Sequence, residues 1–215
     1  MTLVRTCICV ALLLLPACGS STAPTAPTAS VRHRIVVLGD SLAVSPSSSQ
    51  NFVTELQTRL DSTHPGWKMM NESVIGDTTA DGAARFDRAL TGDTDILVLE
   101  LGANDGLQGI AIATIEANLG ALIERAQARS IRILLCGMET PPFNGLDYEL
   151  EFHAVFPRVA GRYQVALVPF LLAGVALDPR LNGPDGVHPN AAGARVVAAN
   201  VWPYLEPLIA QAEVP

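Results

Sequence analysis

Apolar residues in this chain form two kinds of pattern. Short, nearly continuous apolar runs bounded by turn residues are typical of buried strands, whereas apolar residues that recur every three or four positions are typical of helices with one face on a sheet. The two kinds alternate along the sequence. Strands are expected over residues 35–38, 67–74, 95–101, 131–136 and 165–168.

The periodic stretches between these runs predict helices. Thr78 or Thr79 is expected to cap the second of them. The last is expected to be capped by Asn190 and disturbed at Pro203. The helices are expected over residues 52–63, 79–90, 110–128, 148–161 and 191–201.

This alternation of strands and helices predicts a parallel sheet with helices on both faces, a three-layer α/β/α sandwich. In such folds the ligand binds beyond the carboxyl ends of the strands. The loops that contain Ser41, Gly76 and Asn104 each follow a predicted strand. We therefore expect these three residues to lie at one edge of the sheet.

The composition is that of one globular domain. The chain has 215 residues, of which 49% are hydrophobic and 16% are charged. Its formal net charge is −7, and the 14 Lys and Arg are scattered without a basic run. Binding of a nucleic acid or an anionic membrane through a basic face is therefore not expected, and a small molecule is the expected partner.

The N-terminal segment is predicted to be a leader rather than part of the fold. Arg5 precedes an apolar run over residues 7–15. This run is too short to span a bilayer, which needs roughly 20 residues. Residues 1–17 are therefore expected to be a signal peptide.

The end of that run resembles a bacterial lipobox, because Cys18 directly follows Leu-Pro-Ala. A lipobox is cut before its cysteine, which then carries lipid; an ordinary secretory signal cut nearby is the alternative. Residues 18–30 are mostly Ser, Thr, Ala, Pro and Gly, a composition typical of a flexible tether. The folded domain is expected over residues 31–215, in an exported, periplasm-facing envelope protein anchored by lipid.

Cysteine usage agrees with export without a disulfide framework. Cys7 and Cys9 would leave with the leader and Cys18 would carry lipid, so that Cys136 alone would remain. Cys136 ends an apolar run and is expected to be a small buried hydrophobe. Histidines and cysteines are too few and too dispersed for a ligand set, so neither a metal nor a cofactor is expected.

Ser41 is the candidate nucleophile. It lies in Gly39-Asp40-Ser41, directly after the first strand, where its hydroxyl can project into solvent. The alternative is that these residues only form a turn, since all three favour turns and helix caps. A serine hydroxyl reacts only with a base within hydrogen-bond reach, often one that a third group orients.

Among the four histidines, His188 is the best placed to be that base. It follows Asp185 by three residues, in a loop that leads into the last helix, so one short turn can present both side chains. The alternative is a turn aspartate beside a solvated histidine. Acyl transfer also needs donors for the oxyanion, and we expect them from the backbone N–H groups of Ser41 and Gly76 and from the side-chain amide of Asn104, although each could also serve a plain turn.

Four blocks of the sequence, in this order, resemble those of the SGNH (GDSL) hydrolases. The match covers nearly all of the chain from Arg34 to about Leu208. Around Gly76 and Asn104 the sequence is most similar to the multifunctional bacterial acyl-CoA thioesterase, lysophospholipase and arylesterase subgroup. The blocks are Gly39-Asp40-Ser41-Leu42, Gly76, Gly102-Ala103-Asn104-Asp105 and Asp185-Gly186-Val187-His188-Pro189.

The resemblance implies a flavodoxin-like five-stranded parallel sheet of order 2-1-3-4-5. It also implies that Ser41 is the nucleophile, His188 the general base and then acid, and Asp185 its orienter, with Ser41, Gly76 and Asn104 forming the oxyanion hole. No Gly-x-Ser-x-Gly elbow surrounds Ser41, which distinguishes the chain from the α/β-hydrolases. Asp105 is expected to be a structural turn carboxylate.

The expected function is that of a serine esterase that cleaves carboxylic ester or thioester bonds through an acyl-enzyme. Within enzymes, the alternative is a polysaccharide O-deacetylase that uses the same site. Outside enzymes, it is a catalytically silent lipoprotein that binds glycan or lipid.

Overall fold

The computed structural model describes residues 33–213, so the predicted leader, the lipidation of Cys18 and the tether lie outside the described residues. Its sheet has five parallel strands in the order β2-β1-β3-β4-β5, which confirms the expected topology. The strands are β1 (His33–Gly39), β2 (Trp67–Asn71), β3 (Ile96–Glu100), β4 (Arg132–Cys136) and β5 (Ala166–Val168).

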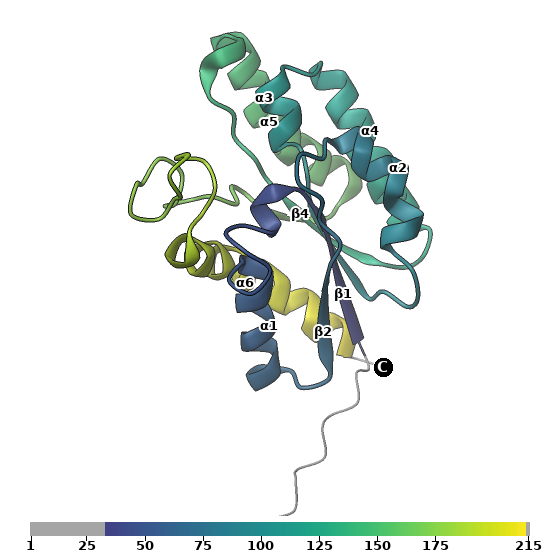
Figure 1. Cartoon of the computed structure of the whole chain (residues 1–215). Helices are drawn as coiled ribbons and strands as arrows, with labels where there is room; N and C mark the ends of the chain where they lie inside the picture. The colour runs from purple at the N-terminus through teal and green to yellow at the C-terminus, as the bar shows by residue number, and fades with distance from the viewer. Residues whose placement is uncertain (1–32, 214–215) are drawn as a thin grey trace, which may run out of the picture.

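Helices cover both faces of this sheet (Figure 1). α1 and α6 pack together on one face, and α2, α4 and α5 pack together on the other. The helices are α1 (Phe52–Thr63), α2 (Thr79–Ala89), α3 (Ala103–Gln108), α4 (Ile112–Gln127), α5 (Leu146–Tyr163) and α6 (Ala191–Glu213), with short 3-10 turns η1 (Ser41–Ala43) and η2 (Pro142–Asn144).

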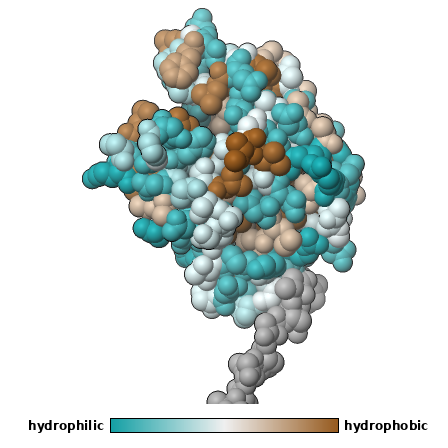
Figure 2. All heavy atoms as spheres, viewed as in Figure 1, coloured by the Kyte–Doolittle hydropathy of each residue, from teal (hydrophilic) through white to brown (hydrophobic). Residues whose placement is uncertain are grey.

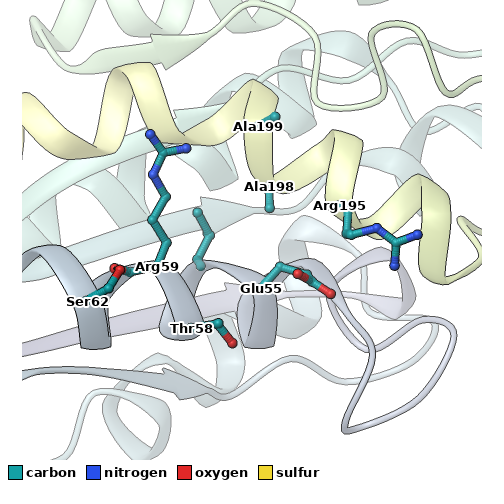
Figure 3. A pocket seen from close by; sticks show the side chains of 8 residues that line it. Glu55, Thr58, Arg59, Ser62, Arg195, Ala198 and Ala199 are labelled. Atoms are coloured by element: carbon teal, nitrogen blue, oxygen red, sulfur yellow. The ribbon is translucent and has the colours of Figure 1, made fainter.

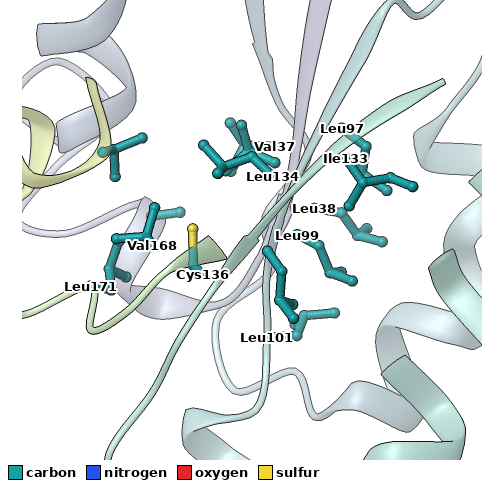
Figure 4. Packing of buried hydrophobic residues seen from close by; sticks show 14 of the residues in the cluster. Val37, Leu38, Leu97, Leu99, Leu101, Ile133, Leu134, Cys136, Val168 and Leu171 are labelled. Atoms are coloured by element: carbon teal, nitrogen blue, oxygen red, sulfur yellow. The ribbon is translucent and has the colours of Figure 1, made fainter. Parts of the chain in front are cut away.

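The core lies on the two faces of the sheet because successive strand side chains point in opposite directions. In Figure 4 Val37 and Leu134 lie on one side of the strands, and Leu38 and Leu99 lie on the other. Cys136 belongs to this core and is fully buried, as expected of a small hydrophobe. Burial also raises the pKa of its thiol well above the usual value, which keeps it protonated and unreactive.

The second strand and the segment after the third strand differ from the sequence expectation. β2 ends at Asn71 rather than near residue 74, since the Asn71 side chain turns the chain by accepting a hydrogen bond from the N–H of Ser73. The following residues still follow β1, because Val74 donates its N–H to the carbonyl of Gly39 at 3.0 Å. The short helix α3 was not expected: its entry uses Gly102 at φ 120°, a conformation that favours glycine.

The expectation that the last helix is disturbed at Pro203 is wrong. α6 is capped by Asn190, whose side chain accepts the N–H of Gly193, but it runs through Pro203 to Glu213. Each proline inside a helix costs about 3 kcal/mol, and α6 contains two of them, Pro203 and Pro207. Burial of one large apolar side chain contributes about 1.5–3 kcal/mol, and three such side chains beyond the expected end offset the cost of the prolines; they are Trp202, Leu205 and Ile209.

Among the helices of residues 33–213, none combines the length and apolar character needed to cross a membrane.

Candidate active site

Ser41 lies where β1 ends and the short turn η1 begins. The turn is closed by Asp40, whose Oδ1 accepts the N–H of Leu42 at 2.9 Å. This local cap holds the backbone so that the Ser41 side chain, which is only partly buried, stands at the carboxyl edge of the sheet. Its Oγ lies 2.8 Å from Nε2 of His188.

Asp185 and His188 come from one tight turn in the loop before α6. Oδ1 of Asp185 accepts the backbone N–H groups of Val187 at 2.9 Å and of His188 at 3.0 Å, and Gly186 between them adopts φ 72°. Oδ2 of Asp185 lies 2.7 Å from Nδ1 of His188. The backbone N–H of His188, followed by that of Val187, holds the pKa of Asp185 well below its usual range, so the carboxyl is ionised.

These contacts make one chain of hydrogen bonds from carboxylate to imidazole to hydroxyl. The ionised carboxylate of Asp185 accepts a hydrogen bond from Nδ1–H of His188, which leaves Nε2 as the acceptor for the Ser41 hydroxyl. Such an arrangement can remove the hydroxyl proton as the oxygen attacks a carbonyl carbon, and it can return that proton to a leaving group.

Asn104 lies in α3, at the same edge. Its Nδ2 donates to Oδ2 of Asp40 at 3.0 Å and to the carbonyl oxygen of Asp77 at 2.9 Å. Both amide protons are therefore engaged. One acceptor directly precedes Ser41 and the other directly follows Gly76. The structure thus brings Asn104 beside both of the other candidate donors.

Gly76 lies on the exposed loop between β2 and α2. It adopts φ 85°, and a Cβ placed on it would meet nothing within 4 Å. Among the described residues, no hydrogen bond engages the backbone N–H of Gly76 or of Ser41. Both groups are therefore available to an oxyanion in front of the serine.

Arg85 of α2, which the sequence analysis did not single out, connects the loop between β2 and α2 to the end of β1. Its guanidinium donates to Oδ2 of Asp77 at 2.5 Å, to the carbonyl of Gly39 at 3.0 Å, and to the carbonyl of Glu72. The loop that carries Gly76 is thereby fastened to the end of β1. A helical arginine carries no local signal for this role, because all three partners come from other elements.

Asp105, in contrast, has the structural contacts expected of it. It is buried and accepts the backbone N–H of Thr79 at 2.8 Å and the Thr79 hydroxyl at 2.6 Å. These bonds join the start of α2 to α3. The carboxylate is thus engaged away from the hydroxyl of Ser41.

The other three histidines lie elsewhere. His33 contacts Asp95, His64 contacts Glu213, and His153 contacts Glu139. Within residues 33–213, no group of three or more His, Cys, Asp or Glu side chains is placed to hold a metal ion.

Figure 3 shows a hollow between α1 and α6 whose lining includes Glu55, Arg59 and Arg195. Neither Ser41 nor His188 lines this hollow, so it is separate from the candidate site.

Comparison with known proteins places the chain in a family. Residues 37–196 match the GDSL-like lipase/acylhydrolase family. The chain is 39% identical to the esterase TesA of Pseudomonas aeruginosa, an alignment that covers 81% of this chain and 89% of that protein. It is 33% identical to an arylesterase of Vibrio mimicus, with coverage of 73% and 80%. It is 31% identical to thioesterase 1/protease 1/lysophospholipase L1 of Escherichia coli K12, with coverage of 84% and 87%.

Solved structures agree with the sequence relatives. The crystal structure of TesA superimposes with a TM-score of 0.77 at 38% identity, covering 82% of this chain and 99% of that one. A psychrotrophic esterase EstA from Pseudoalteromonas sp., inhibited by monoethylphosphonate, superimposes with a TM-score of 0.78 at 25% identity and coverage of 83% and 100%. The chain therefore belongs to the GDSL-like lipase/acylhydrolase family, the SGNH hydrolases, and is a GDSL-type serine esterase.

Proposed function

We propose that this protein hydrolyses carboxylic esters or thioesters through an acyl-enzyme on Ser41, with His188 as general base and acid and Asp185 as its orienter. The observation that carries the proposal is the hydrogen-bond chain from Asp185 through His188 to Ser41, with distances of 2.7 and 2.8 Å. Nucleophile, base and orienter thus already lie within hydrogen-bond reach of one another.

In the first half-reaction, Ser41 Oγ bonds to the acyl carbon as its proton passes to Nε2 of His188. The negative charge on the former carbonyl oxygen is stabilised by the N–H groups of Ser41 and Gly76 and by the Asn104 amide. Collapse breaks the bond to the leaving alcohol or thiol, which takes the proton from His188. Water then attacks the acyl-enzyme by the same path, releasing the acid and restoring Ser41.

Apolar side chains near the site favour an acyl group longer than acetyl. Ile75 and Val187 are exposed, and they are the chain neighbours of Gly76 and His188. Phe143 is 78% exposed in η2, which lies against α3 because Asn144 donates to the carbonyl of Gly106 at 2.8 Å. In Figure 2 the strongly hydrophobic side chains form separate patches, mainly in the upper part of this face. The names of the relatives, arylesterase and lysophospholipase among them, support the same substrate class.

The test is hydrolysis of p-nitrophenyl esters from acetyl to palmitoyl by the wild type and by Ser41→Ala. We expect Ser41→Ala to lose at least about 10³-fold in kcat while keeping its fold by circular dichroism. An optimum at medium or long acyl chains supports the esterase proposed here. An optimum at acetyl, with activity on acetylated polysaccharide, would favour the deacetylase instead. A folded wild type that turns over none of these esters would favour a silent binding protein.

We further propose that residues 1–17 direct export and that Cys18 is lipidated, so that the domain from residue 31 acts at the cell envelope on a flexible tether. The apolar run over residues 7–15 and the cysteine directly after Leu-Pro-Ala support this. The test is metabolic labelling with a fatty-acid analogue in a bacterial host. We expect label in the wild type and none in Cys18→Ser; equal label in both would overturn the lipidation.

A further inference from the structure

The side-chain amide of Asn104 is held in one orientation before any substrate arrives. Its two protons go to Oδ2 of Asp40 and to the carbonyl of Asp77. Turning the amide over would place its oxygen against two acceptors, which disfavours the flipped state. The direction of the Asn104 amide is therefore set by its acceptors, and one of them is a carboxylate next to Ser41.

Asp40 is itself held in place on both sides. Its side chain is completely buried, with Oδ1 taken by the N–H of Leu42, so that Oδ2 faces Asn104. Its backbone N–H donates to Oε2 of Glu100 at 3.1 Å. Glu100 is the last residue of β3 and is also completely buried.

The side chain of Glu100 restricts the residue type at position 39. Gly39 pairs with Glu100 in the sheet, and a Cβ on Gly39 would lie 2.2 Å from Oε2 of Glu100. The carboxyl therefore fills the space where the side chain of residue 39 would lie, directly before the nucleophile turn. No other residue type fits at position 39 without displacing Glu100.

The charges of the two carboxyls differ. Burial, followed by the charge of Asp40, raises the pKa of Glu100 well above its usual value. Its Oε1 has no hydrogen-bond partner among the described residues, which a buried carboxylate could hardly tolerate. Burial raises the pKa of Asp40 to about 6, against the opposing effect of the Leu42 amide and of His188. We therefore assign the negative charge of the pair to Asp40, because both of its carboxyl oxygens accept hydrogen bonds, whereas only Oε2 of Glu100 does. The other titratable groups near this pair are Asp77, Arg85, Cys136 and His188.

We propose that Glu100 and Asp40 form a positioning pair for the oxyanion donor: a neutral Glu100 fixes the peptide N–H at Asp40, and the carboxylate of Asp40 aims the amide of Asn104. Neither side chain touches the substrate. The inference rests on the proposed function, because it takes Asn104 to stabilise the oxyanion. The hydrogen bonds to Asp40 and Asp77 are shared with the oxyanion only when negative charge develops there.

A double-mutant cycle between Asp40 and Asn104 tests this pair. In Asp40→Asn, the side-chain oxygen still accepts the N–H of Leu42, but an NH2 group replaces the oxygen that faces Asn104. The Asn104 amide therefore loses one of its two acceptors. With p-nitrophenyl esters, we expect Asp40→Asn to lower kcat roughly 10–100-fold with little change in KM. Asp40→Asn combined with Asn104→Ala should be no more than about threefold slower than Asn104→Ala alone, because the two residues act through one donor.

Glu100 is tested by comparing two replacements. Glu100→Gln keeps a neutral group with an oxygen for the N–H of Asp40, whereas Glu100→Leu removes that acceptor. We expect Glu100→Leu to lose roughly tenfold or more in kcat and Glu100→Gln to recover most of that loss. Circular dichroism and thermal melting check that each variant folds. If Glu100→Leu does not fold, the Asp40–Asn104 cycle still decides the proposal.

The outcomes separate this inference from the proposed function. If Asn104→Ala leaves kcat unchanged, the oxyanion assignment fails, and with it the pair. If Asn104→Ala is strongly impaired but the loss in the double variant is the product of the single losses, only the positioning pair is overturned. Equal losses of kcat in folded Glu100→Gln and Glu100→Leu would overturn the claim that Glu100 acts as a neutral acceptor for the N–H of Asp40.

Discussion

Oγ of Ser41 lies 2.8 Å from Nε2 of His188, the proposed base. Besides this base, the site must supply groups that stabilise the negative charge on the carbonyl oxygen during attack. Three groups are proposed to donate hydrogen bonds to that charge: two backbone N–H groups and one side-chain amide, which can be removed without altering the backbone. That side chain is Asn104.

Asn104→Ala is therefore expected to lower kcat by roughly 10²–10³-fold with little change in KM, because the amide meets full negative charge only in the transition state. Steady-state kinetics on a soluble p-nitrophenyl ester measures both constants. A raised KM at unchanged kcat would instead mean that Asn104 binds the ground state.

At the scale of single residues, the sequence predicted those site residues that lie in recognisable local patterns. Ser41, Asp185 and His188 lie in turns whose composition and spacing are visible in the chain, and the structure brings them within hydrogen-bond distance of one another. Glu100 carried no such signal. It looks like the polar end of a strand, and its contact with Asp40 depends on the register of β1 against β3, which sequence periodicity does not reveal.

At the scale of elements, α2 acts as a brace for the loop that holds Gly76. It begins with a capping box at Thr78, one of the two caps expected from the sequence, and it presents Arg85 to the ends of β1 and β2. The side chains of Arg85 and Asp77 are nearly buried, so the hydrogen bonds between them are little weakened by water.

Arg85→Met should lower kcat roughly 10–100-fold, because the Gly76 loop loses its two bonds to the guanidinium and, with the bond to Gly39, its connection to β1. A donor misplaced by about 1 Å is costly. Arg85→Lys should recover part of this loss, since one ammonium cannot reach all three acceptors. Arg88→Met, at an exposed position of the same helix, is the matched control. Similar kcat values for the three variants would mean that Arg85 does not position the loop.

The long α6 shows where sequence patterns fall short. Pro203 suggests an end to the helix locally, but the helix continues because its apolar residues are buried against the rest of the fold. That gain is a property of the tertiary structure. The extension brings Glu213 to β2, where Oε1 accepts the indole N–H of Trp67 at 2.8 Å and lies 3.2 Å from Nδ1 of His64.

This contact predicts a dependence of stability on pH. The indole of Trp67, followed by His64, lowers the pKa of Glu213 below its usual value. A carboxyl with a lowered folded-state pKa stabilises the fold above its unfolded-state pKa, about 4.3, and this contribution is lost as pH falls through the folded-state pKa. Glu213→Gln should therefore lower Tm by about 1–3 °C at pH 7 and by much less near pH 3.

Thermal melting across this pH range is the measurement, with the exposed Glu206→Gln of the same helix as control. A difference in Tm that does not shrink toward acid pH would show that the charge of Glu213 is not involved. The value of kcat should not change, because the contact contains no residue of the site.

For the whole molecule, the first described residues and the candidate site lie at opposite edges of the sheet. β1 starts at His33 near the end of α6, at the amino edge of the sheet (Figure 1). Ser41 lies in η1, Asn104 in α3 and His188 in the loop before α6, all at the carboxyl edge. The three layers could be predicted because the alternation of strands and helices allows few topologies, whereas the strand order was implied by the resemblance to the SGNH hydrolases. The loops around the site could not, since their geometry depends on contacts between elements, as with Arg85.

The nucleophile itself is tested by labelling the protein with a fluorophosphonate and mapping the adduct by mass spectrometry of peptides. Attack by Ser41 Oγ forms an oxygen–phosphorus bond and expels fluoride, while the serine proton passes to His188. We expect one adduct, localised by fragmentation to Ser41 rather than to the serines at 45–49, and none in Ser41→Ala or in heat-denatured protein. An adduct at another residue, or equal labelling of Ser41→Ala, would contradict the mechanism.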